Sequence, residues 1–206
     1  MRTSVLCCLA LSASAAMAEP MSDRGYLIRC TDEALAPNCL IVSRGFNLMV
    51  HPEGGTDAEL FAKLQVMPEL SALSFEGTLG EFGDSSAMIV LTSAKAEPDD
   101  IHEGNLRAMQ GKWQPDGEET PFYIEVNGMD WTEVVQEEVG DVFLMSFGEA
   151  CGNGILPGNG LAITLYRYGD DPEDDACWRL EYIDDTTMEL RDFKADQGAV
   201  TFTRLP

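Results

Sequence analysis

The sequence predicts a mainly β protein made of two small β-rich domains, and three observations lead to this fold class. Short runs in which apolar and polar residues alternate fill most of the chain, as in half-buried strands. Turn residues such as Asn127-Gly128 separate these runs, as expected between antiparallel strands. A polar, proline-broken stretch at 95–100 divides two regions of different pattern, so we assign domains to 19–100 and 101–206.

The first region is expected to contain five strands and one helix. Strand-like runs cover 26–30 and 39–43, 46–50 continues or pairs with the second run, and a hairpin spans 71–94 around a turn at 80–84. The resulting order, β-β-β-α-β-β, resembles that of an OB-fold, the small five-stranded barrel. A plain α+β sandwich fits the same order.

The single helix is predicted over about 56–67. Thr56 and Glu59 have the spacing of a capping box, in which each side chain binds a free backbone N–H at the helix start, and Asp57 suits the positive end of the helix dipole. Pro68 then ends the helix. The apolar positions share one helical face: Leu60, Phe61, Leu64 and Met67.

Beyond residue 105, apolar and polar residues alternate almost entirely with a period of two. The apolar members fall in sets such as Phe122/Ile124/Val126, Phe143/Met145/Phe147, Leu161/Ile163/Leu165 and Trp178/Leu180/Tyr182. Short strands at this spacing predict a meander of antiparallel hairpins that curls into a barrel.

Four short motifs give this second region a resemblance to a known family. They are Gly111-Lys112-Trp113, Cys151, Cys177-Trp178 and Thr201-Phe202-Thr203-Arg204. The region resembles small lipocalin-like exported bacterial proteins, which implies a lipocalin-like antiparallel β-barrel. The resemblance also implies that Arg204 packs across the Trp113 ring, a cation–π contact worth about 0.5–2 kcal/mol.

The first 18 residues are expected to be a secretory signal peptide. A basic start, an apolar run with Cys7 and Cys8, and Ala16-Met17-Ala18 match the pattern that signal peptidase cleaves. The apolar run reaches only about half of the ~20 residues that span a bilayer, so we expect no stable membrane insertion. The predicted location is therefore the periplasm or the exterior.

Four cysteines follow the signal, and an even number in an exported chain indicates disulfides. Three connectivities are open, and proximity along the chain favours Cys30–Cys39 and Cys151–Cys177. The chain-entropy model assigns such loops about 2.5–3 and 3.5 kcal/mol of stability, respectively.

Composition and motifs exclude several function classes. The chain carries 13 basic and 36 acidic side chains, a formal net charge of −23, which disfavours binding to nucleic acid. We find no nucleophile, phosphate-loop or metal motif, and His51 and His102 read as solvated loop residues. Glu133, Glu137, Glu138 and the acidic run at 169–175 read as solvated surface. We therefore expect no enzyme activity, no cofactor and no metal.

The remaining candidates are aromatic residues of the second barrel, which either line a ligand cup or fill the core. The candidate ligand-binding set is Trp113, Tyr123, Trp131, Phe147 and Tyr166. The predicted function is non-catalytic periplasmic binding of a small apolar ligand or of a protein partner. An inhibitor of a secreted hydrolase, by likeness to proteinase inhibitors with a similar barrel, and a structural envelope component are the alternatives.

Overall fold

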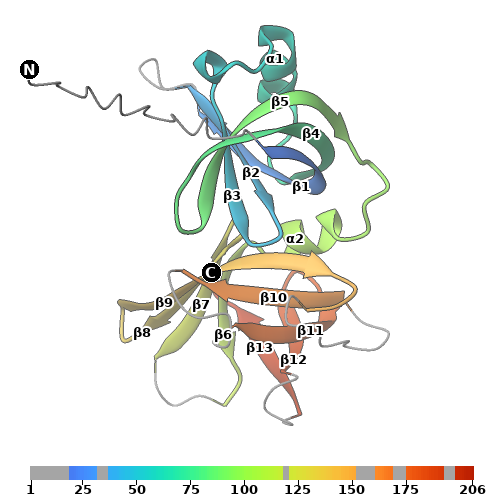
Figure 1. Cartoon of the computed structure of the whole chain (residues 1–206). Helices are drawn as coiled ribbons and strands as arrows, with labels where there is room; N and C mark the ends of the chain where they lie inside the picture. Colours follow the sequence, from blue (N-terminus) through green and yellow to red (C-terminus); the bar gives the residue numbers. More distant parts are fainter. Residues whose placement is uncertain (1–18, 32–36, 118–120, 152–160, 169–174, 193–197) are drawn as a thin grey trace, which may run out of the picture.

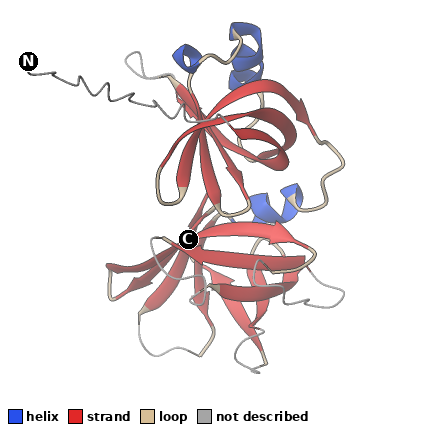
Figure 2. Ribbon diagram, in the orientation of Figure 1, coloured by secondary structure: helices blue, strands red, loops and turns tan. Residues whose placement is uncertain are grey.

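The computed structural model of this 206-residue chain describes residues 19–31, 37–117, 121–151, 161–168, 175–192 and 198–206. The predicted signal peptide and most of the acidic run at 169–175 lie outside these residues. The described chain is largely strand (Figure 2) and forms two closed barrels, one above the other in Figure 1. Among the described helices, none has the length and hydrophobicity needed to cross a membrane.

The N-terminal barrel has the predicted order of elements. Its neighbours run β1-β2-β3-β5-β4 and the sheet closes on itself; β3 and β5 pair in parallel, while the other pairs are antiparallel. The segment at 46–50 is a separate strand that pairs with β2. The elements are β1 (Glu19–Thr31), β2 (Asn38–Ser43), β3 (Phe46–Val50), a 3-10 turn η1 (Pro52–Gly54), α1 (Ala58–Val66), β4 (Ser71–Phe82) and β5 (Ser86–Ala96).

Helix α1 covers one end of this barrel (Figure 1) and buries Phe61 and Leu64 in its core. The predicted capping box is wrong. Asp57 caps the helix, because its Oδ1 accepts hydrogen bonds from the N–H groups of Glu59 and Leu60 at 2.9 and 3.2 Å. Thr56 is buried instead, and its hydroxyl accepts the Leu91 N–H of β5 at 3.0 Å.

The C-terminal barrel is the predicted antiparallel meander. Each strand pairs with the next along the chain, and β13 closes the barrel on β6. The strands are β6 (Gly111–Pro115), β7 (Phe122–Asn127), β8 (Asp130–Val135), β9 (Glu138–Gly148), β10 (Leu161–Arg167), β11 (Ala176–Ile183), β12 (Thr187–Asp192) and β13 (Ala199–Arg204).

Alternation fails in β9 for a physical reason. Phe143, Leu144 and Met145 are all buried, although only alternate side chains of a strand can face the barrel interior. Leu144 belongs to the same core cluster as Tyr26, Ile28 and other residues of the N-terminal barrel. At Leu144, the outer face of β9 is therefore covered by the N-terminal barrel rather than by water.

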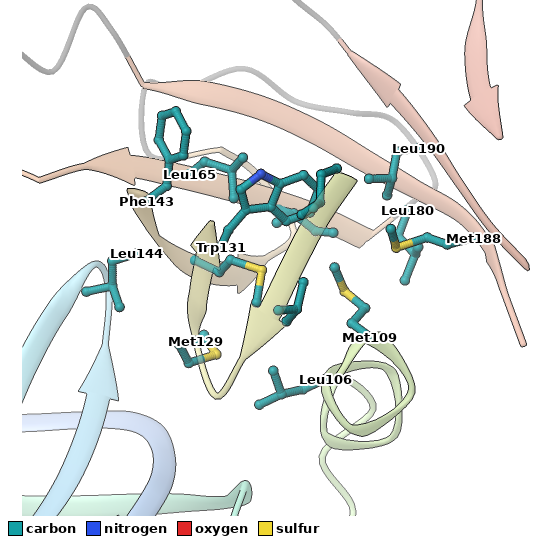
Figure 3. Packing of buried hydrophobic residues seen from close by; sticks show 14 of the residues in the cluster. Leu106, Met109, Met129, Trp131, Phe143, Leu144, Leu165, Leu180, Met188 and Leu190 are labelled. Atoms are coloured by element: carbon teal, nitrogen blue, oxygen red, sulfur yellow. The ribbon is translucent and has the colours of Figure 1, made fainter. Parts of the chain in front are cut away.

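A second helix, α2 (Glu103–Met109), was not predicted. It lies between the two barrels (Figure 1), and its Leu106 and Met109 are fully buried against the core of the C-terminal barrel. Figure 3 shows Met109 directed toward the residues around Trp131, so that α2 closes this end of the barrel. The helix escaped prediction because it is only about two turns long. So short a segment offers too few apolar positions to reveal a helical period.

Both disulfides favoured by proximity are present. Cys30 and Cys39 are directly paired on β1 and β2, with their Cα atoms 4.0 Å apart. Cys151 and Cys177 join the segment after β9 to β11, with a Cα separation of 5.8 Å. The second bridge is buried with Ala162 in a small cluster apart from the two main cores.

Candidate functional site

A cavity of about 700 Å³ lies at the junction of the two barrels. Its walls come from β1, β2 and β4 of the N-terminal barrel and from the segment between β5 and α2. The C-terminal barrel contributes β9 and Met129, which lies between β7 and β8. Neither barrel forms the cavity alone. Its shape therefore depends on how the two barrels are held together.

The N-terminal end of α2 is fixed to the N-terminal barrel. Asp100 Oδ1 accepts the backbone N–H groups of His102 and Glu103 at 2.9 and 2.8 Å, and it also accepts the Tyr26 hydroxyl at 3.2 Å. Glu103 Oε2 accepts the backbone N–H of Ala72 at 2.9 Å. Carboxylates suit this end of a helix, where unpaired N–H groups and the helix dipole favour negative charge.

The C-terminal end of α2 is fixed to the C-terminal barrel. Arg204 donates to the carbonyl oxygens of Ala108, at 2.5 Å, and of Gln110. Trp113 Nε1 donates to the Met109 carbonyl at 2.7 Å, and the Arg204 guanidinium carbon lies 4.1 Å from the Trp113 ring centroid. The contact implied by the family resemblance is thus present, and the same two side chains bind the carbonyls at the end of α2.

Direct contacts between the barrels complete the junction. The Tyr168 hydroxyl donates to Asp130 at 2.9 Å and accepts Nδ2 of Asn47 at 3.1 Å. Burial raises the pKa of Tyr168 to about 12. Gly45, in the turn between β2 and β3, lies so close to Tyr166 that an added Cβ would be 2.4 Å from its ring. The junction is therefore packed at atomic contact beside the cavity.

Three rings form the aromatic wall of the cavity. Tyr26 and Phe147 meet edge to face, with centroids 6.1 Å apart, and His102 stacks on Phe147 at 6.2 Å with an interplanar angle of 12°. Burial is the main reason why the pKa of Tyr26 is raised, and the neighbouring Asp100 charge adds to it. Tyr26 therefore stays neutral through the physiological range.

His102 is not the solvated loop residue that was predicted. It lies at the start of α2, half-buried, and its Nδ1 is buried without a hydrogen-bond partner. Leaving such an atom unpaired costs about 1–3 kcal/mol. His51 caps η1 instead, because its Nδ1 accepts the Glu53 N–H at 3.2 Å.

Acidic side chains outnumber basic ones around the cavity. The carboxylates among its lining residues are Asp23, Glu97, Asp99, Asp100 and Glu149, and the guanidiniums are Arg24 and Arg44. Arg44 pairs with Asp23 at 3.0 Å. Among the residues that the structure describes, no basic side chain forms an ion pair with the other four carboxylates. The cavity therefore carries a negative charge.

Two of the five predicted ligand-binding aromatics lie in the core of the C-terminal barrel. Trp113 and Trp131 are 0% and 1% exposed and pack in one cluster with Leu190, Phe202 and α2. Figure 3 shows Trp131 surrounded by leucine, methionine and phenylalanine side chains. These tryptophans fill the core around α2, which is the alternative role that the sequence left open.

Of the other three, Tyr123 and Tyr166 lie outside the barrel core, whereas Phe147 packs against the edge of that core. Tyr123 neighbours the buried Ile124 on β7 and faces outward, where Lys112 Nζ is 5.2 Å from its ring centroid. Tyr166 packs on Gly45 at the junction, and Phe147 alone of the five lines the cavity. The remaining cavity residues escaped prediction because six separate segments contribute them, and no local sequence pattern joins these segments.

Glu133 is not the solvated surface residue that was predicted, because it lies half-buried in β8. A register shift between Thr132 and Val134 marks an irregularity in this strand. Burial, followed by the nearby Asp141 charge, raises the pKa of Glu133.

The described residues contain no group of three or more His, Cys, Asp or Glu side chains suited to a metal ion.

Comparison of the chain with protein-family models, curated protein sequences and solved structures gives no match in any of the three. We therefore infer function from the geometry and chemistry of the molecule itself.

Proposed function

We propose that this chain is a non-catalytic binding protein that holds a small molecule in the cavity at the junction of its barrels. The observation that carries the proposal is the cavity itself. Its volume of about 700 Å³ falls within the range of roughly 300–1,000 Å³ typical of small-molecule sites. Such sites occur preferentially between domains and place polar groups beside apolar surface. This cavity lies between the two barrels, and polar and charged residues make up the larger part of its lining.

The proposal moves the ligand from the interior of the second barrel to the junction. Trp113, Trp131 and the side chains of α2 occupy the barrel end that faces the N-terminal barrel. Tyr26 and Phe147 instead present ring surface to the cavity. A ligand there would touch both barrels, so binding would also strengthen their association.

We further propose an OB-fold for the N-terminal barrel and a lipocalin-like fold for the C-terminal one, each as a separate domain. The closed order β1-β2-β3-β5-β4 with a helix before β4 supports the first assignment, and the eight-stranded meander supports the second. Export through a cleaved signal at 1–18 agrees with two disulfides, which persist in oxidising compartments.

Blocking the cavity tests the proposal. Ser146 lines the cavity from the outer face of β9, which it shares with the buried Leu144, so Ser146→Trp should fill part of the space. Ser93→Trp, on an exposed position of β5, is the matched control. The probes are 2-phenylethylammonium, 2-phenylethanol and 3-phenylpropanoate, followed by saturation-transfer NMR. We expect at least one probe to bind the wild type and the control but not Ser146→Trp. Absence of binding by all three, or binding unaffected by Ser146→Trp, would overturn the proposal.

A second candidate function, inhibition of a secreted hydrolase, is favoured by the β8–β9 hairpin. Val135 and Val139 are 42% and 68% exposed at its tip. Between them, Gln136 and Glu137 both have positive φ, of 54° and 68°, a conformation that costs non-glycine residues energy. The hairpin thus holds two exposed valines beside a tight two-residue turn, where a proteinase pocket could receive one of them.

An elastase-type serine proteinase is the appropriate target, because its small specificity pocket accepts valine. We expect slow, tight inhibition by the wild type and its loss in Val135→Asp/Val139→Asp, with an unchanged circular dichroism spectrum. Rapid cleavage of the hairpin, or equal inhibition by the double variant, would eliminate this candidate.

A further inference from the structure

We infer that the junction cavity selects an organic ammonium ion: a positively charged amine attached to an apolar, preferably aromatic, body. The inference rests on the proposed function, since it concerns the same cavity, and adds the chemical class of the ligand. Three properties of the lining residues carry it: their charge, their aromatic surface, and the apolar residues that line the cavity together with the charged ones.

The first property is an excess of unpaired negative charge. Asp23 is neutralised by Arg44 and hydrogen-bonded by the Ser43 hydroxyl at 2.9 Å. One oxygen of Glu97 accepts the Ser74 hydroxyl at 2.7 Å, and Asp100 Oδ1 accepts neutral donors only. These hydrogen bonds hold the two carboxylates in position without cancelling their charge.

Two more carboxylates, those of Asp99 and Glu149, stand exposed at the cavity on opposite barrels. An ammonium group between them would be attracted by both barrels at once. The net charge of −23 over the whole chain acts in the same direction, because it concentrates cations near the surface and repels anionic ligands.

The second property is the aromatic surface. Tyr26 and Phe147 lie edge to face at an interplanar angle of 74°, so that together they form a corner rather than a flat wall. The negative faces of aromatic rings attract organic cations, and corners of this kind are used to bind alkylammonium groups. The Tyr26 hydroxyl is held by Asp100, which fixes the orientation of this ring.

The third property is that buried apolar residues line the cavity together with the charged ones. Val42, Ala72 and Met129 are buried residues that line the cavity in addition to the two rings. A bare inorganic cation would leave this surface unused, and a neutral apolar molecule would leave the carboxylates without a partner. A ligand with a cationic head and an apolar body satisfies both parts.

The test compares the same three probes, which share a phenylethyl body and carry a cationic, a neutral or an anionic head group. We expect 2-phenylethylammonium to bind about tenfold more tightly than neutral 2-phenylethanol, and 3-phenylpropanoate to bind more weakly than either. Rising salt should weaken binding of the cation and leave that of the neutral probe unchanged, because screening acts only on the charged one.

A charge-neutralising variant distinguishes attraction by the carboxylates at the cavity from attraction by the net charge of the whole chain. Asp99→Asn/Glu149→Gln should weaken binding of the cation about threefold or more while sparing 2-phenylethanol. The control, Glu81→Gln/Asp84→Asn, removes the same charge from exposed positions that do not line the cavity, and it should leave cation affinity almost unchanged.

Three outcomes are distinguishable. Equal binding of the cation and the neutral probe, or tighter binding of the anion, overturns the choice of an ammonium ligand but leaves the proposed function standing if Ser146→Trp still blocks binding. Failure of all three probes to bind overturns both. Equal losses in the two double variants would attribute the preference to the overall charge of the chain and would also contradict the inference.

Discussion

Gly45→Ala tests the contact between the two barrels. The glycine has φ +78°, where an alanine costs about 1 kcal/mol. The new methyl group would also lie 2.4, 2.6 and 2.7 Å from Cδ2, Cε2 and Cγ of Tyr166. Because Cγ is at the root of the ring, rotation of the ring cannot clear the overlap. Overpacking of this kind costs about 1–3 kcal/mol, which gives a total of about 2–4 kcal/mol.

A double-mutant cycle with Tyr166→Ala isolates the steric part. Equilibrium urea unfolding of the wild type, the two single variants and the double variant gives the four free energies of unfolding. Without the ring, the cost of Gly45→Ala should fall to the backbone contribution of about 1 kcal/mol, so the two sites should be coupled by about 1–3 kcal/mol. An equal cost of Gly45→Ala in both backgrounds would mean that the ring does not lie on Gly45 in solution, and would refute this packing.

Other predictions concern Arg204, the two disulfides and the pH dependence of stability. Arg204→Lys should lower the free energy of unfolding by about 2–3 kcal/mol, because lysine cannot reproduce the paired guanidinium hydrogen bonds to the end of α2; urea unfolding measures it. Cys151→Ala/Cys177→Ala should lower the free energy of unfolding by about 3.5 kcal/mol, and Cys30→Ala/Cys39→Ala by about 2.5–3 kcal/mol. The larger loss belongs to the disulfide that closes the longer loop. Tyr168 has a pKa of about 12, above the value of about 10 for an unfolded tyrosine, so the stability it contributes is complete below pH 10 and is lost as the pH rises to 12. Tyr168→Phe should flatten this alkaline loss, measured as melting temperature against pH.

The pKa of Glu133 leads to a prediction about the pH dependence of stability. The effect has the opposite sign to that of a carboxylate whose pKa folding lowers. Burial raises this pKa, so ionisation opposes folding and the contribution of Glu133 becomes less favourable as pH rises from acid to neutral. Glu133→Gln should therefore raise the melting temperature at pH 7 and have little effect at acidic pH. A lower melting temperature at pH 7 would contradict the assignment.

The local elements of both barrels were predictable because short-range patterns encode them. The alternation at Phe122, Ile124 and Val126 follows from a sheet with one buried face, and the pairing of Cys30 with Cys39 follows from a short hairpin. Thr56 misled the prediction because its sequence spacing matches a cap, whereas packing against β5 gave its hydroxyl another partner.

The candidate site was not predictable, because it arises where the two barrels meet. Its lining residues are spread from Ser22 to Glu149, and no local pattern joins them. Leu144 gives the one usable signal in retrospect, since an apolar residue on the outward face of a strand indicates that something covers that face.

The most direct measurement of the central claim is a map of amide chemical-shift changes as 2-phenylethylammonium is added to isotopically labelled protein. A ligand at the junction should shift the amides of Asp100–His102 and Ser146–Gly148 together, since these segments face one cavity from two sides. Shifts confined to residues around Trp131 and Leu190 would place the ligand inside the second barrel and contradict the claim.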